Sequence, residues 1–117
     1  HRTYRVRSGR DHNQAIGFPD GSYNETRACN GDMIRYDENT LLHSLPTGNS
    51  RRDVAIYISK DEGKTWNDGK IIVPRFSAYS SMCVLPDKSI GFYVEEREVD
   101  TTSYEMVFYR LSIDNIQ

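Results

Sequence analysis

The sequence predicts an all-β fold built from short antiparallel strands. Eight tyrosines and few alanines favour strands over helices. No window of about 11 residues carries the apolar stripe of an amphipathic helix, whereas strand-like runs recur at short spacing with turn residues between them. A chain of 117 residues forms one domain at most.

The strand-like runs follow one another along the whole chain, and most are separated by turns at residues 37–39, 46–49, 86–88 and 97–102. Several alternate in the way expected of a strand with two different faces. Val54, Ile56 and Ile58, for example, share one face of their strand. The expected strands are residues 3–8, 32–36, 40–45, 53–59, 70–73, 81–85, 89–95 and 104–113.

The strands also repeat as a group. Three strands within residues 33–59 are echoed by three within residues 81–111, at a period of roughly 50 residues that suits one four-stranded propeller blade. We therefore expect residues 1–27 to end a preceding blade, residues 28–76 to form one blade, and residues 77–117 to form a final blade that lacks its closing strand.

A polar turn motif follows the fourth strand. The segment from Ser59 to Trp66 reads Ser-x-Asp-x-Gly-x-Thr-Trp, the pattern known as an Asp box. Asp61 can accept hydrogen bonds from turn amides, and Gly63 can adopt a positive φ. We expect Trp66 to fold back into an apolar slot.

Composition argues against several functions. The net charge is −2, no basic run with interleaved aromatics suggests nucleic acid, and no stretch approaches the roughly 20 apolar residues of a membrane span. Cys29 and Cys83 do not have the spacing of a zinc site. We expect two separate thiols, packed as small hydrophobic residues, and a disulfide between them remains an alternative. The histidines show no ligand spacing, so His43 is interpreted as a strand residue. For Asp61 a turn network is preferred to calcium. We assign no metal and no cofactor.

Four stretches of the chain resemble the sialidase (neuraminidase) superfamily. They are Ala-Cys-Asn-Gly-Asp-Met-Ile-Arg-Tyr at 28–36, Leu-Leu-His-Ser-Leu-Pro at 41–46, Arg-Arg-Asp-Val at 51–54 followed by the Asp box, and Ala-Tyr-Ser at 78–80 with Ile-Gly-Phe-Tyr-Val-Glu at 90–95. The order of these motifs is similar to the C-terminal third of a six-bladed exo-alpha-sialidase propeller with an Asp box (BNR) repeat. The resemblance covers about residues 28–113.

The resemblance implies roles for three residues. Arg51 matches an arginine that grips the substrate carboxylate, with Arg52 as the less favoured neighbour. Tyr79 matches the tyrosine nucleophile that sialidases use in place of a carboxylate. Glu95 matches a glutamate that orients another arginine of the site. The family's Tyr-Glu pair is Val-Glu here, so Glu96 remains a competing candidate.

The function implied is that of a retaining exo-alpha-sialidase, which removes terminal sialic acid from glycoconjugates. The chain opens on His1 rather than Met, and the family's acid/base, first arginine and activating glutamate have no match here. We therefore expect the remaining blades to come from another chain or from residues outside this sequence, and the 117 residues alone to be inactive. Family resemblance favours a secreted, periplasmic or lysosomal location. The alternative is a non-catalytic Asp-box propeller that acts as a binding module or sialic-acid lectin.

Overall fold

The protein is described by a computed structural model that covers residues 31–47, 51–99 and 103–117. In this part of the chain the all-β prediction is confirmed: six antiparallel strands form a single sheet in the order in which they occur along the sequence. The strands are β1 (Asp32–Asp37), β2 (Thr40–Pro46), β3 (Arg52–Ser59), β4 (Lys70–Val84), β5 (Ile90–Arg97) and β6 (Glu105–Leu111), and a short 3-10 turn, η2 (Ile113–Asn115), follows them.

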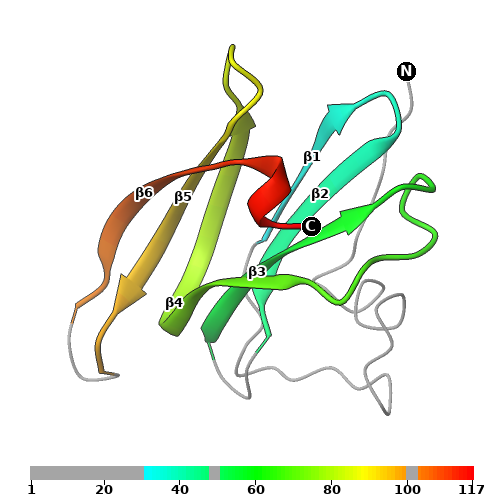
Figure 1. Ribbon diagram of the computed structural model, residues 1–117. Helices are drawn as coiled ribbons and strands as arrows, with labels where there is room; N and C mark the ends of the chain where they lie inside the picture. The colour runs from blue at the N-terminus through cyan, green and yellow to red at the C-terminus, as the bar shows by residue number, and fades with distance from the viewer. Residues whose placement is uncertain (1–30, 48–50, 100–102) are drawn as a thin grey trace.

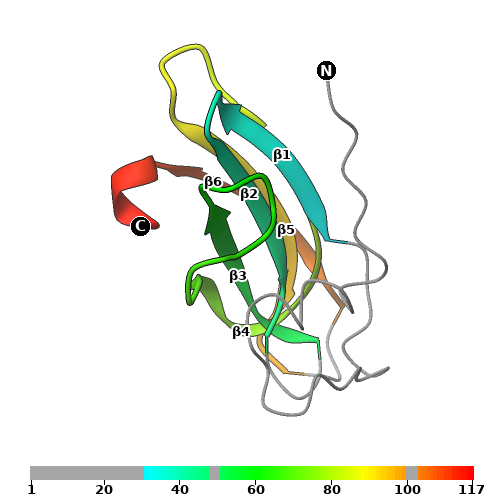
Figure 2. The same cartoon turned by 90° about the vertical axis from the view of Figure 1, so that its right-hand side faces the viewer.

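The sheet curls into a half-barrel, a shape compatible with part of a propeller (Figure 1). Turned by 90°, the strands lie nearly edge-on and η2 projects from one face of the sheet (Figure 2). That face is the concave one, because Ile116, which directly follows η2, is only 1% exposed and packs in the main core cluster. Burial of this side chain therefore attaches the end of the chain to the sheet.

β3 runs through the middle of this core. Val54, Ile56 and Ile58 point into the main cluster, as the alternating pattern predicted. Ala55 and Tyr57 point to the opposite face, where they form a second cluster. Both faces of β3 are thus buried, which explains its almost continuous apolar sequence.

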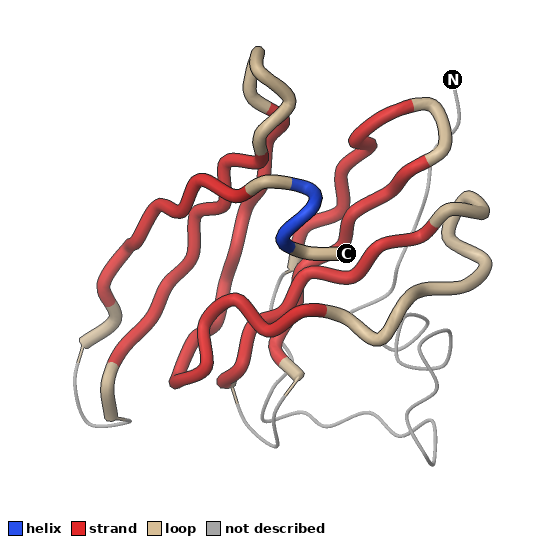
Figure 3. The backbone as a smooth tube through the Cα atoms, viewed as in Figure 1, coloured by secondary structure: helices blue, strands red, loops and turns tan. Residues whose placement is uncertain are grey.

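One strand is longer than the sequence indicated. The strands expected at 70–73 and 81–85 are parts of β4, which bends and continues from one half of the sheet into the other (Figure 3). Its first part pairs with β3, at Val54 and Val73, and its last part pairs with β5. Pro74 lies within β4, where the β3 pairing shifts register, and proline is tolerated at such an irregularity. The two groups of strands assigned to successive blades are therefore joined in one sheet.

The last strand is shorter than expected. β6 ends at Leu111, and the Ser112 side chain accepts a hydrogen bond from the Asp114 backbone N–H, which begins η2. The strand expected at 3–8 lies outside the described residues. None of the described segments forms a helix long and apolar enough to cross a membrane.

Candidate functional site

Arg51 and Tyr79, which the resemblance singled out, lie next to each other. Arg51 immediately precedes β3, and Tyr79 lies in the neighbouring strand β4. The Cζ atom of Arg51 is 5.4 Å from the centroid of the Tyr79 ring, within the range of a cation–π contact. The Tyr79 side chain is 44% exposed. A cation and an accessible phenol therefore share one patch of surface, although 27 residues separate them along the chain.

The backbone around this contact is irregular, because the pairing between β3 and β4 is interrupted there. Asp53 has φ of 56°, in the left-handed region, and the β3–β4 register shifts on either side of Val54. The Thr47 hydroxyl donates a hydrogen bond to the Asp53 carbonyl at 2.8 Å. The Ser77 N–H donates to the Arg51 carbonyl at 3.0 Å. The Ser77 hydroxyl accepts a hydrogen bond from the buried Val54 N–H at 3.1 Å. Two polar side chains thus satisfy backbone groups that regular pairing leaves unmet.

Two further arginines lie beside this patch, at the same ends of β3 and β5. Arg52 and Arg97 lie opposite Phe76 on its two neighbouring strands. Their Cζ atoms are 5.2 and 5.9 Å from the Phe76 ring centroid. Arg97 also lies 4.3 Å from the Tyr104 ring centroid. Arg52 is further held by the carboxylate of Asp53 at 3.3 Å, whereas Arg51 contacts the ring of Tyr79.

The Tyr79 hydroxyl has no base beside it in the described part of the chain, where no carboxylate accepts a hydrogen bond from it. The tyrosine that does pair with a glutamate is Tyr109. Its hydroxyl donates to Glu96 Oε2 at 2.6 Å, and the Arg75 guanidinium donates to Glu96 Oε1, 3.0 Å from Nε. Burial and the bond to Glu96 raise the pKa of Tyr109 to about 12, so this phenol stays protonated and acts as a donor.

The two candidate glutamates occupy opposite faces of β5. Glu96 is 4% exposed on the core face, in line with Val94. Glu95 is half-buried on the other face, opposite Met106 of β6, and makes no ion pair within the described residues. Period-two alternation of Ile90, Phe92 and Val94 could have identified Glu96 as the inward residue. Its partners Arg75 and Tyr109 were not foreseen, because they come from other strands.

The Asp box forms the internal turn network that the sequence predicted. The Thr65 N–H and hydroxyl donate to the two carboxylate oxygens of Asp61, at 2.9 and 2.6 Å. The Ser59 hydroxyl accepts from the Gly63 N–H, and Gly63 has φ of 85°. Hydrogen bonds from Thr65 lower the pKa of Asp61 to about 2. Trp66 packs against Leu45, Ala55 and Tyr57, which confirms the predicted apolar slot.

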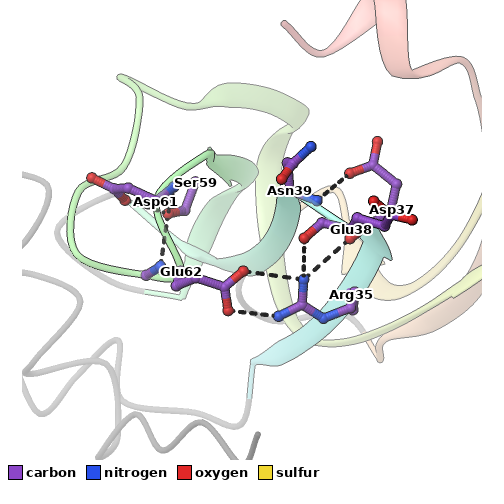
Figure 4. Close-up of polar contacts among 8 residues, drawn as sticks. Arg35, Asp37, Glu38, Asn39, Ser59, Asp61 and Glu62 are labelled. Atoms are coloured by element: carbon purple, nitrogen blue, oxygen red, sulfur yellow. Dashed lines mark hydrogen bonds and ion pairs between the residues drawn. The ribbon is translucent and has the colours of Figure 1, made fainter. Parts of the chain in front are cut away.

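An ion pair connects the Asp box to the first hairpin. Arg35 of β1 contacts both carboxylate oxygens of Glu62, with 2.8 Å from Nη2 to Oε2, and also donates to the Glu38 carbonyl (Figure 4). Both side chains are partly exposed, so the pair contributes about 1 kcal/mol at most. The Asp box begins at the last residue of β3, whereas Arg51 precedes its first residue, so the two lie at opposite ends of this strand.

The remaining candidates offer no metal centre. His43 is a buried residue of β2, as predicted, and its ring lies 5.6 Å from that of Trp66. Cys83 is a free, exposed thiol rather than a packed one, because it points to the outer face of β4; Cys29 lies outside the described residues. Within the described ranges, no three His, Cys, Asp or Glu side chains are placed to hold a metal ion.

No protein-family model matches the chain. No curated protein matches it either.

Proposed function

We propose that this chain is part of an exo-alpha-sialidase, with Arg51 and Tyr79 in its substrate site. The observation that carries the proposal is the contact of the Arg51 guanidinium with the Tyr79 ring, combined with the exposure of that ring. The motif order around these residues, Arg-Arg-Asp-Val before the Asp box and Ala-Tyr-Ser after it, supports the same reading.

Sialic acid is the sugar to which this pair is suited. It carries a carboxylate on its anomeric carbon, and a planar guanidinium binds a carboxylate through two parallel hydrogen bonds. A nucleophile beside that carboxylate works best when it is neutral, since an Asp or Glu nucleophile would be repelled. The Tyr79 phenol meets this requirement.

In the proposed reaction the Tyr79 oxygen bonds to the anomeric carbon while the glycosidic C–O bond breaks and the leaving oxygen takes a proton. Water then attacks the same carbon while the bond to the Tyr79 oxygen breaks; the water gives up a proton, the Tyr79 oxygen regains one, and sialic acid leaves with retained configuration. Both the acid that protonates the leaving group and the base that deprotonates Tyr79 would lie outside the described residues. Glu95 would orient a further arginine. The 117 residues alone are therefore expected to be inactive.

The test uses the protein that carries this chain, expressed in full and assayed with a fluorogenic sialoside. Tyr79→Phe should lower kcat by about 10³-fold or more with little change in KM, as expected when a nucleophile is removed. Arg51→Ala should mainly raise KM. The matched control is Tyr93→Phe, because Tyr93 is also 44% exposed, and it should leave both constants unchanged. Full activity in Tyr79→Phe would refute the nucleophile.

A binding module is the second candidate, because carboxylate recognition would need only the Arg51 guanidinium beside the exposed Tyr79 ring. Such a protein would bind a sialoside through Arg51 but would not cleave it. Calorimetric titration with a sialoside separates the two functions. Binding that Arg51→Ala abolishes, with no turnover, would favour the lectin over the enzyme.

A further inference from the structure

The two outer strands of the sheet differ in a way that points to self-association. β1 and β6 each have one neighbour in the described sheet. β1 carries Asp32, Arg35 and Asp37, and its pairing with β2 is irregular between Arg35 and Asp37. Charges and a bulge are the usual means by which an edge strand avoids pairing with another chain.

β6 lacks the bulge, because its pairing with β5 is regular through seven successive residue pairs. Its charged residues, Glu105 and Arg110, lie near its two ends. The stretch between them, Met106 to Tyr109, is uncharged, and no proline or lysine occurs in the strand. A regular edge with an uncharged stretch of this kind readily accepts an added strand.

The outward face of β6 adds an apolar surface beside this edge. Met106 is 51% exposed and Phe108 is 54% exposed. Phe108 lies over Gly91, where an added Cβ would come within 3.1 Å of its ring. Its neighbour across the strands is Tyr93, with 6.3 Å between the ring centroids. Exposed aromatic and methionine side chains such as these are enriched on surfaces that bind protein.

We propose that β6 pairs antiparallel with β6 of a second copy of this chain, centred on Val107. The sequence of the strand is self-complementary in this register. On the outward face Met106 lies opposite Phe108 of the partner, a sulfur–aromatic pair. Arg110, which donates to the Asp87 carboxylate of its own chain, lies opposite Tyr104. On the other face Glu105 lies opposite Tyr109. No like charges oppose one another, which favours a second copy over an unrelated strand.

This inference does not depend on the proposed function. A seven-residue strand pair with a small apolar face buries less surface than a standard stable interface. The dimer is therefore a weak one. Each copy would supply the missing neighbour of the other's β6, and the sheet would continue across a twofold axis.

Sedimentation equilibrium of the 117-residue polypeptide in reducing buffer tests the proposal. The apparent mass should rise from 13.5 kDa toward twice that value with increasing concentration. Met106→Lys should weaken the dimer about tenfold or more, because a lysine on an edge strand opposes pairing. Ile71→Lys is the matched control, since Ile71 is 47% exposed on β4, and it should leave the dimer unchanged. A common melting temperature would show that both variants fold.

Cross-linking tests the register. In a background with Cys29→Ser and Cys83→Ser, Val107→Cys should oxidise to a covalent dimer, because residue 107 lies opposite itself within disulfide reach. Met106→Cys should not, because the two copies of residue 106 lie diagonally apart. A chain that stays monomeric at millimolar concentration, or a dimer that Met106→Lys leaves intact, would overturn the proposal. Slow hydrogen exchange of β6 amides in a dilute monomer would overturn it too, because the edge would then be covered from within the chain.

Discussion

Acid should destabilise the folded chain first through His43. This residue lies in the middle of β2, between β1 and β3, and is 5% exposed. Burial lowers the pKa of His43 from 6.5 to about 4. The folded state therefore keeps the imidazole neutral at a pH where the unfolded chain binds a proton.

The sign and size of the effect follow from this difference. A lowered pKa in the folded state gives stability that is full above pH 6.5 and is lost as the pH falls toward 4. Each pH unit in this window is worth 1.36 kcal/mol, so the total loss is about 3 kcal/mol. That is a substantial share of the roughly 5–15 kcal/mol that stabilises a typical domain.

The assay is urea unfolding between pH 8 and pH 4, followed by Trp66 fluorescence, with the folded-state pKa measured by NMR titration of the imidazole. His43→Leu should remove most of the pH dependence in this window, whatever it does to stability at neutral pH. The quantity compared is the slope of the free energy of unfolding against pH. A change in stability at neutral pH caused by the substitution itself therefore does not affect the comparison. An imidazole that titrates near 6.5 in the folded protein, or an unchanged slope in His43→Leu, would refute the reasoning.

Two further predictions each compare the same substitution at two positions of the chain. Gly63 and Gly69 both have positive φ, but an added Cβ at Gly63 meets atoms only at 3.8 Å, whereas at Gly69 it would lie 2.4 Å from an aromatic ring carbon. Gly63→Ala should cost about 1 kcal/mol and Gly69→Ala about 3 kcal/mol; equal losses in urea unfolding would contradict the steric account. Glu96→Gln should cost about 2 kcal/mol, less than a fully buried pair because Arg75 is 32% exposed. Glu95→Gln should change the free energy of unfolding by less than about 0.5 kcal/mol, so a larger loss there would reverse the assignment of the two carboxylates.

Local patterns predicted the features that depend on nearby residues. The alternation in β3 places Val54 and Tyr57 on opposite faces, and both faces were found as predicted. The Asp-box turn closes within a few residues, so Asp61 and Gly63 could be placed from the motif alone. Such features rest on period two and on turn chemistry, which act over short stretches of chain.

The arrangement of the candidate site could not be predicted in this way, because it is formed by contacts between different strands. The bond between Glu96 and Arg75 spans 21 residues, and Arg51 and Tyr79 come from two segments that lie 28 positions apart in the sequence. The sequence offered no reason to continue β4 through Pro74, because an isolated strand gives no information on where its neighbour shifts register.

The sequence by itself thus determined the all-β class, the faces of the strands and the Asp-box turn, because hydrophobic alternation and turn residues act on their own segment. Tertiary structure alone decided that the strands form one curled sheet, which side chains bind Glu96, and that a guanidinium lies over an exposed phenol. These outcomes depend on the register between strands, which is set by packing of the whole core rather than by any one segment.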